Sequence, residues 1–116
     1  MKIENSIQNH PDFVVVAGYR NLLPKSWLDF PVITALNIHP SLLPNYPGPN
    51  PAEWAVLKGE TATGISIIKM TDEYDQGPII AQQKLTIIPT DTRISLYQKL
   101  YELGAEMIVN LISAYK

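Results

Sequence analysis

NIHPSLLP, at residues 37–44, follows an apolar run and precedes a loop that is rich in proline. We predict that it contains the end of a buried strand. Side chains two residues apart on an extended backbone point to the same face, so Asn37 and His39 would share one face while Ile38 packs on the other. A strand end is rigid enough to fix polar groups for chemistry. The stretch therefore indicates a site that uses an amide and an imidazole.

Both polar side chains also have an ordinary structural interpretation. An Asn before a loop is usually a turn residue that bonds to nearby backbone. A His beside a Pro is usually a surface residue or a hydrogen-bonded structural one. From residue types alone the structural interpretation is the more common, and a second string of residues favours the catalytic one, as described below.

Length, charge and composition narrow the class of protein. The 116 residues suit a single domain, which we expect to span residues 1–116. A formal net charge of -2 argues against a broad basic surface for nucleic acid or for an anionic membrane. The absence of cysteine excludes disulfides and thiolate metal sites, and with two histidines we expect no metal ion. The first ten residues are polar, and no apolar run is long enough to span a bilayer, so we expect a cytoplasmic protein.

The pattern of apolar runs predicts an α/β fold. Four runs have the composition of strands: residues 12–17, 32–38, 64–70 and 79–88. Three segments carry helical signals: residues 25–29, 51–58 and 94–115. The first two strands are typical of parallel strands buried on both faces, and the last is expected to be antiparallel or at an edge. We therefore predict a partial Rossmann-like open sheet, mostly parallel with an antiparallel edge, in which ligands bind beyond the carboxyl ends of the strands.

Two helix starts carry capping signals. Asn50 can cap the helix that begins at Pro51, with Glu53 as the reciprocal acid of a capping box. Asp91 or Thr92 can cap the last helix. One apolar stripe of that helix is expected to pack against the sheet, and it consists of Leu96, Leu100, Leu103, Met107 and Leu111.

An acidic loop, residues 71–77, is the second candidate site. It holds Asp72, Glu73 and Asp75. Three acids in a loop are most often solvated. A metal site is the second interpretation, although the number and spacing of the acids match no calcium-loop template. Alternatively, one carboxylate folds back onto His39, where it would favour the protonated ring and fix its tautomer. The residues alone leave these interpretations open.

Several motifs together resemble the catalytic domain of the formyltransferase family. They are NIHPSLLP at 37–44, Tyr46-x-Gly48, Pro51, Thr63-Gly64 and Asp75-x-Gly77-Pro78. The resemblance runs from about Asp12 to the last helix. The family includes enzymes that formylate methionyl-tRNA, glycinamide ribonucleotide and sugar nucleotides.

The resemblance implies transfer of a formyl group from 10-formyltetrahydrofolate, as co-substrate, to a primary amine. The family's triad maps onto Asn37, His39 and Asp75. The amide and a protonated imidazole would donate hydrogen bonds to the oxyanion, and the carboxylate would hold the ring and help take the proton from the amine. The resemblance also implies folate contacts from nine positions: Ser41, Leu42, Leu43, Pro44, Leu22, Leu23, Met70, Asp72 and Glu73.

The expected acceptor is methionyl-tRNA, with a nucleotide sugar or glycinamide ribonucleotide as alternatives. A non-catalytic remnant or binding module is the alternative of another class. The chain departs from the family pattern at Pro47, where the family usually has a basic residue. The resemblance also implies further strands before the segment at Asp12, which we expect to be absent here. Residues 14–16 would then form an exposed apolar edge, so we expect a homodimer, a complementing N-terminal chain, or a fragment with little activity.

Overall fold

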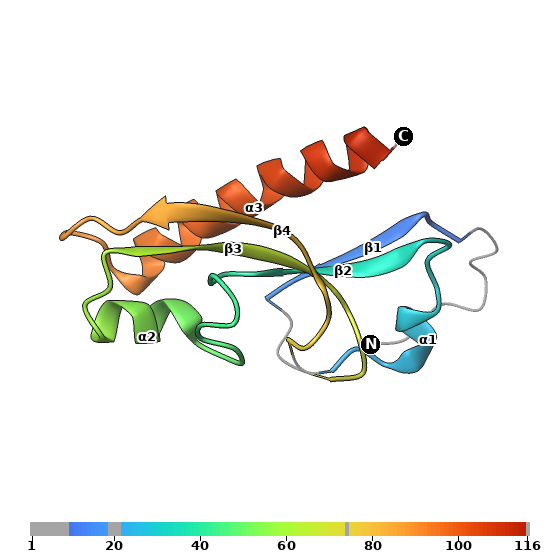
Figure 1. Ribbon diagram of the computed structural model, residues 1–116, viewed down its shortest axis with the longest axis horizontal. Helices are drawn as coiled ribbons and strands as arrows, with labels where there is room; N and C mark the ends of the chain where they lie inside the picture. The colour runs from blue at the N-terminus through green and yellow to red at the C-terminus, as the bar shows by residue number, and fades with distance from the viewer. Residues whose placement is uncertain (1–9, 19–21, 74, 116) are drawn as a thin grey trace.

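A four-stranded sheet forms the centre of the protein (Figure 1). The computed structural model describes residues 10–18, 22–73 and 75–115. The strands lie in the order β1-β2-β3-β4, and they are β1 (Phe13–Ala17), β2 (Thr34–His39), β3 (Ala62–Lys69) and β4 (Ile79–Thr86). The helices are α1 (Lys25–Leu28), α2 (Pro51–Leu57) and α3 (Arg93–Tyr115). These elements confirm the predicted strands and helices, with ends that differ by no more than two residues.

The strand pairing is mixed. β1 pairs with β2 in parallel, whereas β2–β3 and β3–β4 are antiparallel. The α/β class and the antiparallel edge are confirmed, and antiparallel pairing extends one strand further into the sheet than we expected. The reason lies in the connection from β2 to β3. Its helix, α2, has seven residues, which reach only about 10 Å, so the chain re-enters the sheet at the end where β2 left it.

Helix α3 runs along one face of the sheet, above β3 and β4 in Figure 1. Its buried residues are Leu96, Leu100, Gly104 and Ile108, which recur every four positions. The predicted stripe is therefore correct at Leu96 and Leu100. Beyond them the buried line passes through Gly104 and Ile108, and the remaining members of the stripe, Leu103, Met107 and Leu111, are partly buried against the core.

Gly104 brings α3 close to the strand that carries the site residues. A Cβ atom at this position would lie 2.6 Å from Cγ2 of Ile38. Ile38 is buried and stands between Asn37 and His39 on β2. The helix thus packs directly against the far side of the strand end that holds both polar groups.

The sheet ends at β1 in the described part of the chain, where β2 is its single neighbour. Val16 is buried together with Leu23 and Ala35, but Val15 is 40% exposed. Burial of this strand on both faces, which its composition had suggested, is not found, because Val16 is the single buried residue of β1. None of the helices among the described residues is long and apolar enough to cross a membrane.

Candidate active site

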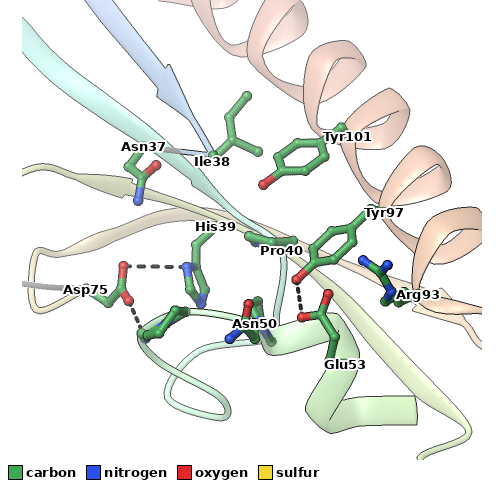
Figure 2. A pocket seen from close by; sticks show the side chains of 14 residues that line it. Asn37, Ile38, His39, Pro40, Asn50, Glu53, Asp75, Arg93, Tyr97 and Tyr101 are labelled. Carbon is green, nitrogen blue, oxygen red and sulfur yellow. Dashed lines mark hydrogen bonds and ion pairs between the residues drawn. The ribbon is translucent and has the colours of Figure 1, made fainter. Parts of the chain in front are cut away.

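A cavity of about 620 Å³ lies at the carboxyl end of β2 (Figure 2). One wall holds Asn37, His39 and Asp75, which come from β2 and from the acidic loop. The opposite wall holds groups from α2 and from the start of α3. The volume is in the range of small-molecule sites, and polar groups converge on it from several elements.

His39 and Asp75 form a close pair in this wall. Nδ1 of the imidazole lies 3.4 Å from Oδ1 of the carboxylate, and the side chains are only 6% and 9% exposed. The second carboxylate oxygen, Oδ2, accepts a hydrogen bond of 2.6 Å from the backbone N–H of Gly48. Of the three interpretations of the acidic loop, the geometry supports the fold-back onto His39. Asp72 and Glu73 are exposed, and no cluster of three metal-binding side chains occurs among the described residues.

The other ring nitrogen of His39 is also engaged. Nε2 lies 2.9 Å from the carbonyl oxygen of Tyr46. A carbonyl and an ionised carboxylate both only accept, and the contact to the carbonyl is the shorter, so in a neutral ring Nε2 carries the hydrogen while Nδ1 faces Asp75. A protonated ring would satisfy both partners at once.

This geometry modifies the role that the resemblance implied for His39. Because both nitrogens already face protein oxygens, the imidazole must release one of them before it can donate to a substrate oxygen. The contact to Asp75 is the longer of the two, so Nδ1 is the nitrogen more easily shared with a ligand.

Asn37 completes this wall. It lies two residues before His39 on β2, and its side-chain amide stands beside the His39–Asp75 pair in Figure 2. Asn37 lines the cavity, so its amide can reach a ligand there.

The opposite wall contains residues that sequence reasoning missed. The Tyr97 hydroxyl donates a 2.8 Å hydrogen bond to Oε2 of Glu53, and the rings of Tyr97 and Tyr101 stack with centroids 6.0 Å apart. Burial raises the pKa of Tyr97, and the hydrogen bond to Glu53 raises it further. Burial also raises the pKa of Tyr101, with a smaller contribution from the charge of Glu53. Arg93 adds a cation to the lining.

One signal for these residues was present in the sequence, and another was misleading. Tyr97 and Tyr101 are four positions apart and follow Leu96 and Leu100, so they flank the buried line of α3. Glu53, in contrast, was interpreted as part of a capping box with Asn50. That expectation is wrong: Asn50 is left-handed, with a φ of 62°, and its side chain makes no capping bond.

The nine residues expected to contact folate do not line this cavity. Three are buried in the fold, namely Leu23, Ser41 and Leu43. Two are partly buried: Leu42 contacts Gly64, and Met70 packs against the cluster of Leu23. Four are exposed, namely Leu22, Pro44, Asp72 and Glu73. Within the 40–50 loop, Ser41 and Leu43 turn inward, and the Ser41 hydroxyl bonds within the loop, whereas Pro44 faces outward. Folate contact at all nine positions stays a prediction.

Comparisons with known proteins agree on one family. The family model described as formyl transferase matches residues 2–112. Methionyl-tRNA formyltransferase from Myxococcus xanthus is 41% identical over 108 residues, which cover 93% of this chain and 35% of that protein.

Solved structures show the same fold. Phosphoribosylglycinamide formyltransferase from Bacillus halodurans aligns with a TM-score of 0.69 at 39% identity, over 80% of this chain and 48% of that one. The Streptococcus pneumoniae enzyme of the same description aligns with a TM-score of 0.77 at 26% identity, over 90% of this chain and 58% of that one. The chain spans about a third of the length of the curated relatives it matches.

Proposed function

The chain belongs to the formyl transferase family, and from this premise we propose that it transfers a formyl group from 10-formyltetrahydrofolate to a primary amine. The observation that carries the proposal is the His39–Asp75 pair beside Asn37 at one cavity. An amide, an imidazole and a carboxylate are the groups that this reaction needs, because it develops an oxyanion and releases a proton.

The chemistry follows from the positions of the three groups. The acceptor nitrogen attacks the formyl carbon, and the carbonyl oxygen becomes a tetrahedral oxyanion. The Asn37 amide donates to that oxygen, and the protonated ring of His39 donates its Nδ1–H as it turns from Asp75. The carboxylate of Asp75 then takes the proton from the amine, directly or through water. The carbon–nitrogen bond to the folate breaks as the carbonyl re-forms, and the folate nitrogen leaves with the proton that Asp75 took from the amine.

Methionyl-tRNA is the acceptor we favour, because the curated relatives are named for it. The net charge of -2 gives no electrostatic support for tRNA. Glycinamide ribonucleotide is the second candidate. It is supported by the similarity to the Bacillus halodurans enzyme and by Arg93, whose guanidinium at the cavity suits a phosphate group.

The test is an assay of formyl transfer with methionyl-tRNA, glycinamide ribonucleotide and an amino sugar nucleotide in parallel. Asn37→Ala, His39→Ala and Asp75→Asn should each lower the rate by about 10²–10³-fold, as expected for loss of one transition-state donor or its base. His10→Ala and Asp12→Asn change the same residue types away from the cavity and should retain wild-type rates. Full activity of His39→Ala would contradict the mechanism.

Inactivity of the wild-type chain with all three acceptors leads to a second measurement. Folate binding is then tested by isothermal titration with 10-formyltetrahydrofolate. Absence of both transfer and binding would favour the non-catalytic remnant over the enzyme.

A further inference from the structure

One row of side chains crosses the sheet at the site. His39 on β2 is the register partner of Ser66 on β3, and Ser66 is the register partner of Gln82 on β4. Residues paired in register project from the same face, with Cβ atoms about 5 Å apart. The row therefore connects the imidazole to the outer strand of the sheet, and the 40–50 loop crosses above it.

Ser66 fastens the first part of the 40–50 loop to this row. Its side chain is fully buried. Oγ donates a 2.7 Å hydrogen bond to the carbonyl of Ser41, and it accepts bonds of 3.0 Å from the Leu43 N–H and 2.9 Å from Nε2 of Gln82. One donor and two acceptor positions are the whole capacity of a hydroxyl, so Ser66 is saturated by these contacts.

Gln82 supports the same part of the loop. Its Nε2 also donates a 2.8 Å bond to the carbonyl of Leu43. The amide turns toward the loop although much of the residue remains exposed.

Ser41 shapes the second part of the loop. It too is fully buried. Its Oγ donates a 2.7 Å bond to the carbonyl of Asn45 and lies 3.3 Å from the carbonyl of Tyr46. The Tyr46 carbonyl is the one that accepts the Nε2–H of His39. Two residues further on, the N–H of Gly48 donates a hydrogen bond to the Asp75 carboxylate.

We propose that Ser66 and Ser41 are positioning residues for the imidazole: they hold the 40–50 loop so that the Tyr46 carbonyl keeps the hydrogen of His39 on Nε2 and leaves Nδ1 to Asp75. The inference rests on the proposed function for its catalytic consequence, but its structural part concerns the ring alone. It also gives Ser41 a different role from the folate contact that the family resemblance implied, because its hydroxyl is buried and used within the loop.

The first test reads the tautomer of His39 directly by ¹⁵N NMR of the intact chain, with His10 as the internal reference. In the wild type the neutral ring should carry its hydrogen on Nε2. Ser66→Ala and Ser41→Ala should give a mixture of the two neutral tautomers. Thr63→Val removes another buried hydroxyl from β3 and should leave the His39 spectrum unchanged.

A milder variant covers the case in which loss of a buried serine unfolds the protein. Gln82→Leu removes one bond to Ser66 and one to Leu43 from an exposed residue. It should shift the tautomer population in the same direction by a smaller amount. A wild-type tautomer spectrum in folded Ser66→Ala, or in Gln82→Leu if the serine variants do not fold, overturns the inference.

The second test separates positioning from folate contact. Ser66→Ala and Ser41→Ala should lower kcat by about 10-fold or more, as expected when an acid–base group loses its orientation, with KM for 10-formyltetrahydrofolate unchanged. A raised KM with unchanged kcat would instead make Ser41 a folate contact and overturn the proposal. If the wild type transfers no formyl group, the proposed function fails, while the tautomer experiment still decides the role of the two serines.

Discussion

At the scale of single residues, the phenol of Tyr97 is a sensitive reporter on the cavity. Burial and the hydrogen bond to Glu53 raise its pKa above the ordinary value of about 10. The raised pKa means that Tyr97 stabilises the fold below about pH 10, and that this contribution is lost as pH rises through the folded-state pKa.

We therefore predict that Glu53→Gln lowers the pKa of Tyr97 without returning it to the ordinary value, because the burial remains. The measurement is a spectrophotometric titration of phenolate absorbance, with Tyr97→Phe to identify the transition. An unchanged titration of Tyr97 in Glu53→Gln would show that the carboxylate does not act on the phenol.

The contrast between His39 and Glu53 shows what sequence reasoning can reach at this scale. Alternation along a strand is a local property, so it placed Asn37 and His39 on one face, and the family motif then pointed to Asp75. Glu53 follows Asn50 at the spacing of a capping box, yet its partner is a hydroxyl 44 positions away. A local pattern carries no information about such a distant competitor, so the opposite wall of the cavity was missed.

At the scale of elements, hydrogen bonds to the carboxylate of Asp91 stabilise the start of α3. Asp91 accepts hydrogen bonds from Nζ of Lys99, from the Ile88 N–H and from Oγ of Ser95, and these bonds lower its pKa, with Lys99 contributing most. Of the two predicted caps, Thr92 fills the capping position, since its Oγ1 accepts from the Ser95 N–H. Asp91 instead braces the turn that precedes the helix.

Because the pKa of Asp91 is lowered in the folded state, its stabilisation is present above the unfolded-state pKa and is lost as pH falls through the folded-state pKa. We predict that Asp91→Asn lowers the urea midpoint at neutral pH and that the difference from wild type disappears in acid. Asp29→Asn breaks an exposed Lys–Asp pair and should change the midpoint very little at either pH. Equal effects of the two variants would contradict this account.

A second prediction for α3 concerns its contact with β2. Gly104→Ala places a methyl group against Ile38, and such overpacking costs about 1–3 kcal/mol, against a helix-propensity gain of about 0.5–1 kcal/mol. We expect a net loss of about 1 kcal/mol in the free energy of unfolding, together with reduced formyl transfer, because Ile38 stands between the two polar site residues. Asn110→Ala, on the exposed side of the same helix, should stabilise slightly. An increase in stability for Gly104→Ala would show that the helix moves away freely.

The long helix also shows the limit of periodicity. The spacing of leucines predicted an amphipathic helix and identified Leu96 and Leu100 as buried. The same spacing could not identify Gly104 as buried, because a residue without a side chain contributes nothing to a hydrophobic pattern. Its role is visible only in the structure, where the helix approaches β2 closely.

At the scale of the whole molecule, the outer edge of β1 is the surface most suited to association. Val15 is 40% exposed on a strand with one neighbour among the described residues. Exposed apolar strand edges pair with other strands, so we predict self-association that Val15→Lys weakens. Sedimentation velocity over a range of concentrations measures it, and Val109→Lys, on the exposed face of α3, is the matched control. A wild-type chain that stays monomeric at all concentrations would contradict the prediction.

The mixed sheet was the least predictable feature at this scale. Apolar runs reveal that strands exist, but the direction of β3 depends on where the 40–50 loop and α2 return the chain. That path is set by contacts such as those of Ser66, which join residues more than twenty positions apart.

The loop that faces the imidazole and the carboxylate touches them with peptide groups: a carbonyl at Tyr46 and an N–H at Gly48. Every amino acid but proline offers both groups, so substitutions at neighbouring loop positions preserve the hydrogen bonds to His39 and Asp75. Pro47, between the two, illustrates this freedom. Evolution can thus change the loop's outward side chains to suit a new acceptor while the His39–Asp75 pair keeps its backbone contacts.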